Sequence, residues 1–73
     1  MQKRDPGKNL KIMRYRLGYT QNEFGKLHGV SQAAISWWET NSYPIPPGMV
    51  QRFIKLSRKI GLNYSYDDLR VDE

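Results

Sequence analysis

Apolar residues recur at helical spacing near the start of the chain. Leu10, Met13 and Leu17 follow one another at intervals of three and four residues, and Gly18 comes next. Such spacing places apolar side chains on one face of a helix, and glycine is a common stop residue. The pattern predicts a first helix that begins near Lys8 and ends at Leu17.

A second helix is predicted after Thr20. The run Thr-Gln-Asn-Glu is a capping box, because the Thr20 hydroxyl can accept from the amide of Glu23 while the Glu23 carboxylate reaches back. Phe24 and Leu27 supply its apolar stripe, and Gly29 ends it.

A third helix follows after one short turn. Ser31 is a good N-cap, and the helix is expected to run to about Thr40. Ala34, Ile35 and Trp38 lie on one side of it, which predicts the face that packs inward.

Residues 41–47 are rich in Pro, Ser and Asn, which predicts a loop. Pro47 suits the first position of a fourth helix, and Gly61 closes it. The predicted inward residues of this helix are Met49, Phe53, Leu56 and Ile60.

A short fifth helix is predicted near the end of the chain. Ser65 can cap it, Asp67 and Asp68 suit its first turn, and Leu69 is expected to pack inward. The fold class is therefore all-α, with five short helices. We expect a flexible basic arm over 1–7, one domain over 8–70 and an acidic tail over 71–73.

Composition narrows the function. A chain of 73 residues has little room for a deep catalytic cleft, and it has no cysteine for disulfides or thiolate metal sites. It shows no nucleophile with a paired base, and its single histidine, His28, is expected to pack against the core. We therefore expect no enzyme, metal or cofactor. Without a long apolar run or a signal peptide, the expected location is the cytoplasm.

The charge is unevenly distributed along the chain. Its net charge is +5, but four of its seven acidic residues lie in the last seven positions. Residues 1–66 hold eleven Lys and Arg against three acidic residues, a net charge of +8. A basic body suits a polyanionic partner such as nucleic acid, although a merely basic surface is an equally good reading of charge alone.

The second and third predicted helices satisfy several requirements of two helices that cross over a tight turn. Gly25 supplies a small residue where the backbones approach, and Gly29 accepts a positive φ in the turn. Apolar residues are expected to face the core at Phe24, Val30, Ile35 and Trp38.

In this register the chain resembles the Cro/repressor (Xre) family of helix-turn-helix DNA-binding proteins of bacteria and phages. The resemblance rests on Thr20-Gln21, the turn glycine, the hydrophobic residue after it and the closing Glu39, and it extends over about residues 10–69. It implies a lambda-repressor-like domain in which Arg14 and Glu39 form an ion pair that also aims Arg14 at a DNA phosphate. Asn41 stands where the family usually has glycine, Gly25 replaces the usual alanine, and the loop 42–48 lacks basic residues.

The resemblance implies that the third helix enters the major groove. The expected base contacts are Gln32, Ala33, Ser36 and Trp37. Gln32 can pair with adenine and Ala33 can touch a thymine methyl, although a solvated Gln32 and an inert Ser36 are the alternatives. For Trp37, packing on the Pro44–Pro47 loop ranks before DNA contact. The expected phosphate contacts are Gln21, Arg14, Lys3, Arg4, Lys8 and Arg52, with Lys55 as a weaker candidate.

These features predict a transcriptional regulator, repressor or Cro-like, that reads a short operator in double-stranded DNA. Because one recognition helix covers only a few base pairs, a homodimer on a palindrome is expected. The alternative is an antitoxin or another protein-interaction module that keeps the fold and uses Trp37 and the tyrosines as anchors for a protein partner.

Overall fold

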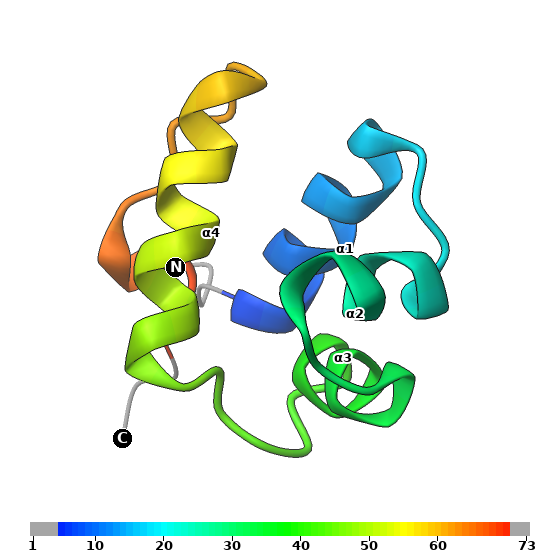
Figure 1. Cartoon of the computed structure of the whole chain (residues 1–73). Coiled ribbons are helices and arrows are strands. Elements are labelled where there is room, and N and C mark those ends of the chain that lie inside the picture. Colours follow the sequence, from blue (N-terminus) through cyan, green and yellow to red (C-terminus); the bar gives the residue numbers. More distant parts are fainter. Residues whose placement is uncertain (1–4, 71–73) are drawn as a thin grey trace.

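Four helices and one 3-10 turn make up the part of the chain that the computed structural model describes, residues 5–70. The helices are α1 (Pro6–Leu17), α2 (Gln21–His28), α3 (Gln32–Glu39) and α4 (Pro47–Lys59), and the turn spans Tyr66–Asp68. Within these residues no strand is present. Figure 1 shows α1, α2 and α3 grouped together, with α4 standing opposite them. No helix in the described range has the length and apolar character needed to cross a membrane.

Helix α1 begins at Pro6, two residues before the predicted start at Lys8. Asp5 caps it by accepting from the amide of Lys8 at 2.9 Å. Asn41, which follows α3, also binds this helix start. Its side-chain nitrogen donates to the Asp5 carboxylate at 2.8 Å, and its side-chain oxygen accepts from the Gly7 amide at 3.0 Å. The Pro-Gly pair thus opens the helix, so the predicted flexible arm over 1–7 is wrong at these two residues.

Gly7 is buried because α1 meets the end of α3 at this residue. A Cβ atom on Gly7 would collide with the carbonyl of Glu39 and would lie 2.7 Å from the carbonyl oxygen of Trp38. Gly25 has the same role between α2 and α3, since its Cβ would lie 2.7 Å from the carbonyl oxygen of Val30. The predicted close approach at Gly25 is confirmed, whereas the one at Gly7 was not predicted.

The local signals around α2 and α3 are confirmed. Thr20 and Glu23 form both bonds of the capping box, at 3.1 and 2.9 Å. Ser31 caps α3 by accepting from the amide of Ala34 at 3.1 Å. Gly29 takes the expected left-handed conformation with φ of 71°. The start of α2 and the turn between α2 and α3 are therefore determined by residues within a few positions of each.

The core differs from the prediction mainly on α4. The buried stripe of this helix is Val50, Phe53, Ile54 and Ser57, while the predicted Met49, Leu56 and Ile60 are half-buried. Because one position of this stripe, Ser57, is polar, the pattern of apolar residues predicted the wrong face of α4. The Ser57 hydroxyl is nevertheless satisfied, since it donates to the Ile54 carbonyl at 2.7 Å and accepts from the Tyr64 amide at 3.0 Å.

The remaining core residues come from α1, α2, α3, the loop before α4 and the residue after the 3-10 turn. Of the predicted inward residues outside α4, Leu17, Val30 and Ala34 are half-buried. Leu27 was expected in the stripe of α2, but its side chain is 54% exposed. The buried apolar residues outside α4 are Leu10, Met13, Phe24, Ile35, Trp38, Ile45 and Leu69.

The predicted fifth helix is only a single 3-10 turn, Tyr66–Asp68. As predicted, Ser65 precedes the turn and Leu69 is buried, and the Asp68 carboxylate accepts from the Ser65 amide and hydroxyl at 2.8 and 3.0 Å. Two bonds fasten this segment to α1: the Tyr64 hydroxyl donates to the Asn9 carbonyl at 3.0 Å, and the Asn9 side chain donates to the Asp68 carbonyl at 2.8 Å. The end of the described chain is thus tied to its first helix.

The close approach at Gly7 generates a prediction with a matched control. Gly7→Ala should lower the free energy of unfolding by about 1–3 kcal/mol, because the added methyl meets immobile backbone. Gly48 also follows a proline at the start of a helix, and its Cβ would meet nothing within 4 Å. Gly48→Ala should therefore leave stability unchanged or raise it by up to about 1 kcal/mol. Urea unfolding of both variants measures this, and equal effects would contradict the close approach.

Candidate nucleic-acid interface

A buried ion pair joins α1 to the end of α3. Arg14 donates to Glu39 through Nε at 2.6 Å and through Nη2 at 3.0 Å. Both side chains are enclosed, with 7% of Arg14 and 2% of Glu39 exposed. The hydrogen bonds to Glu39 raise the pKa of Arg14 above its ordinary value. The ion pair that the sequence resemblance implied is confirmed.

Two further contacts extend this pair to α2. Gln21, the first residue of α2, donates its side-chain amide to Glu39 at 3.1 Å. Arg14 Nη1 donates to the carbonyl of Tyr19, just before α2, at 2.9 Å. The network of Arg14, Gln21 and Glu39 therefore fixes α3 relative to both other helices. The guanidinium donates to protein acceptors and lies against the ring of Tyr15, and these contacts hold α3 in position. Its contact with a DNA phosphate stays a prediction.

The outer face of α3 is open to solvent. Gln32, Ala33 and Trp37 are exposed and Ser36 is half-buried, while Ile35 and Trp38 on the opposite side lie in the core. The side-chain amide of Gln32 makes no hydrogen bond within residues 5–70. The four predicted base-contact residues thus lie on one helix, with at least three of them available to a partner.

Trp37 packs on the loop that follows α3, and it does so through Tyr43. The two rings meet edge to face with centroids 5.2 Å apart, yet 48% of Trp37 and 58% of Tyr43 remain exposed. The amides of Ser42 and Tyr43 both donate to the Trp37 carbonyl, at 2.9 and 3.4 Å, which holds the loop in place. The prediction was that Trp37 folds over the Pro44–Pro47 loop, and the ring contact is instead with Tyr43, just before that segment.

The predicted phosphate contacts are spread over several elements. Lys8 is exposed on α1, and the half-buried Gln21 begins α2. Arg52 lies on α4, where its Nη1 donates to the carbonyl of His28 at 3.3 Å. Lys3 and Arg4 lie outside the described residues.

His28 is a packing residue, as predicted. Its ring meets Phe24 and Phe53 edge to face, at centroid distances of 4.5 and 5.0 Å. Burial, and then the positive charge of Arg52, lowers the pKa of His28 below its ordinary value. Its Nε2 atom is buried without a hydrogen-bond partner among the described residues. In that same part of the chain no three His, Cys, Asp or Glu residues are grouped so that they could hold a metal ion.

Comparison with known proteins does not place the chain in a family. No family model matches it, and neither does any curated protein or solved structure. The functional argument therefore rests on the residues of α2, α3 and α4 alone.

The ion pair generates a prediction about stability. Glu39→Gln should lower the free energy of unfolding by about 3–5 kcal/mol, because Arg14 keeps its charge in a buried position without a counter-charge. The double variant Arg14→Leu/Glu39→Gln should cost less than the sum of Glu39→Gln and Arg14→Leu, since it leaves no lone charge behind. Urea denaturation of the four proteins measures the coupling, and strictly additive costs would show that the pair does not act as a unit.

The burial of His28 generates a prediction about pH. Above its ordinary pKa of 6.5, His28 is neutral in both states and its contribution to stability is complete. As the pH falls below this value, the unfolded chain takes up a proton first, so stability falls until the pH passes the lower pKa of the folded state. The urea midpoint should therefore drop between about pH 8 and about pH 5.5.

His28→Phe is the control for this pH dependence. It keeps an aromatic ring beside Phe24 and Phe53 but removes the titrating group, so the slope over this range should flatten. Asp5 and Glu23, whose pKa values are lowered from ordinary values of 3.8 and 4.5, lose their contributions only at lower pH. An unchanged slope in His28→Phe would assign the pH dependence to another group.

Proposed function

We propose that this protein is a lambda-repressor-like regulator of the Cro/repressor kind that reads double-stranded DNA with the outer face of α3. The observation that carries the proposal is that α3 exposes one face to solvent while buried contacts fix its position. Gln32, Ala33 and Trp37 are exposed on α3, while the buried pair of Arg14 and Glu39 holds the same helix in place. A helix presented in this way suits the major groove, which is wide enough to admit it.

The residue types on this face fit base edges. The free amide of Gln32 suits the N6 and N7 atoms of adenine, and the Ala33 methyl suits the methyl group of thymine. Ser36 can donate to a base or a phosphate. Trp37, braced by Tyr43, offers a flat apolar surface for a thymine methyl or a deoxyribose.

The charge of the protein supports a polyanionic partner. Residues 1–66 carry +8, and Lys8 and Arg52 are exposed cations that could meet phosphates, together with Lys3 and Arg4 from the preceding segment. The N-terminus of α2, where Gln21 lies, offers free backbone amides of the kind that bind phosphate. Arg14 is given a positioning role, because its donors serve Glu39 and Tyr19.

An α3 of eight residues spans about 12 Å, which covers only a few base pairs. We therefore expect a homodimer that binds a palindrome whose half-sites lie one helical turn apart, and we expect it to act in the cytoplasm. The second candidate function is a protein-interaction or antitoxin module. The half-exposed pair of Trp37 and Tyr43 favours it, since aromatic residues of this kind anchor protein interfaces.

Selection of bound sequences from a random duplex library tests the proposal. The expected result is a palindrome bound at least ~10³-fold more tightly than scrambled DNA at near-physiological salt. Affinity should fall steeply as salt rises, because DNA binding releases counterions, whereas an apolar protein interface is nearly indifferent. Weak binding without a consensus would refute the specific regulator and favour the protein-interaction module.

A second prediction assigns base reading to Gln32. Gln32→Ala should relax the preference at one position of each half-site, at a cost of about 1–3 kcal/mol for the preferred base. Gln51→Ala, which removes an exposed amide from α4, should leave the selected sequence unchanged. Competition titrations against single-base operator variants measure both effects. If Gln32→Ala and Gln51→Ala have the same base preferences, Gln32 does not contact a base.

A further inference from the structure

A groove between α2 and α4 lies apart from the outer face of α3. Its volume is about 420 Å³, which is within the range of small-molecule sites. The residues that line it are Leu27, His28, Arg52, Lys55, Leu56 and Lys59.

The rim of the groove is strongly basic. Arg52, Lys55 and Lys59 follow one another at intervals of three and four residues, so they form a row along one side of α4. All three are exposed, and neither lysine forms an ion pair within residues 5–70. Because no acidic residue lines the groove, the row is a site of uncompensated positive charge.

The floor of the groove is apolar. Leu27 is 54% exposed on α2, Leu56 is half-buried on α4, and the buried ring of His28 lies between the two helices. Phosphates of a DNA backbone would pair with the basic row, but they have no apolar group to contact Leu27 and Leu56. A ligand with both an anionic and an apolar part satisfies both halves of the lining.

Arg52 connects the groove to the turn before α3. Its Nη1 donates to the carbonyl of His28, the last residue of α2, at 3.3 Å. This bond holds the guanidinium at the wall of the groove, so a ligand does not have to order it. Only Gly29, Val30 and Ser31 separate His28 from the first residue of α3.

We propose that this groove binds a small amphipathic anion, in which an acidic head group meets Arg52, Lys55 and Lys59 and a short apolar body covers Leu27 and Leu56. The binding itself does not depend on the proposed function. Where that function holds, the ligand would occupy a regulatory position next to the turn that leads to the reading helix.

Octanoate is the probe, and amide chemical shifts of the ¹⁵N-labelled full chain are the readout. Octanoate should shift the amides of Leu27, His28 and Leu56, with a dissociation constant of about 1 mM or lower. Lys55→Gln/Lys59→Gln should raise that constant at least ~10-fold, which corresponds to about 1.4 kcal/mol. The matched control is Lys11→Gln/Arg58→Gln, which removes the same charge from exposed helix positions outside the groove and should bind octanoate as the parent does.

Three results with small ligands would overturn the proposal. One is that octanoate fails to shift the groove amides. Another is that inorganic phosphate, which has no apolar part, binds as tightly as octanoate. The third is that 1-octanol, which has no charge, binds as tightly as octanoate. A duplex DNA titration on the same sample separates this site from the proposed function. Shifts at α3, the start of α2, Lys8 and Arg52 that spare Leu27, Leu56 and Lys59 would support both, whereas shifts centred on Leu27, Leu56 and Lys59 would make the groove a DNA contact and overturn the inference. A duplex that shifts nothing would count against DNA binding and leave the octanoate result standing.

Discussion

The arrangement of the helices depends on one buried carboxylate. Glu39, at the end of α3, accepts from Arg14 of α1 and from Gln21 of α2, so a single side chain joins three helices. A charge that is enclosed to this degree is tolerable only when its partners are fixed. The orientation of α3 is therefore set by hydrogen-bond geometry as well as by the less directional packing of Ile35 and Trp38.

The features that sequence reasoning found are those whose causes lie close together in the chain. The capping box of Thr20 and Glu23 and the left-handed Gly29 each depend on residues within a few positions. The ion pair of Arg14 and Glu39 spans 25 positions, and it came from the family resemblance rather than from spacing. Local chemistry thus predicted the turn between α2 and α3, and the family resemblance predicted the ion pair that holds α3 in place.

The misses have a common physical cause, because each depends on a distant segment. Gly7 has to be glycine because the end of α3 approaches it, and Ser57 can be buried because its hydroxyl accepts from the Tyr64 amide. Leu27 fits the helical stripe of α2, but it points into the groove beside α4. The same limit hid Tyr43 as the partner of Trp37, since only the fold of the loop brings the two rings together.

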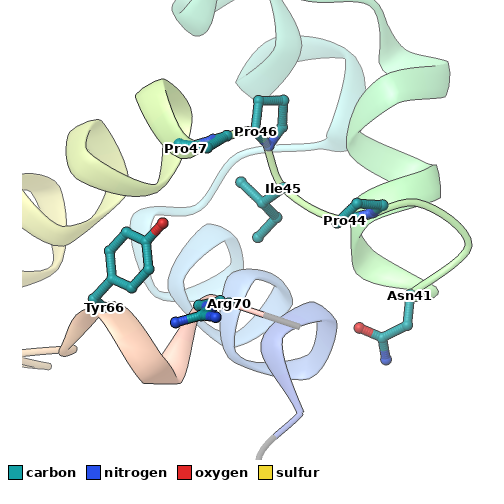
Figure 2. A pocket seen from close by; sticks show the side chains of 7 residues that line it. All are labelled: Asn41, Pro44, Ile45, Pro46, Pro47, Tyr66 and Arg70. Carbon is teal, nitrogen blue, oxygen red and sulfur yellow. The ribbon is translucent and has the colours of Figure 1, made fainter. Parts of the chain in front are cut away.

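The loop between α3 and α4 also carries a pocket of about 400 Å³, and its prolines meet the end of the described chain there. Figure 2 shows Tyr66 and Arg70 facing Ile45 and the neighbouring prolines across this pocket. The bonds that join Tyr64 to Asn9 and Asn9 to Asp68 reach further, since they bring late residues against early ones across 55 and 59 positions of sequence.

Contacts of such separation have a kinetic consequence. The caps and turns of this protein rest on local signals, whereas the contacts of the last segment with α1 join residues near opposite ends of the chain, and contacts of such separation slow folding. The slow step of folding is therefore expected to be the docking of that segment. During synthesis, α3 would therefore leave the ribosome before Tyr64, whose hydroxyl ties the last segment to α1.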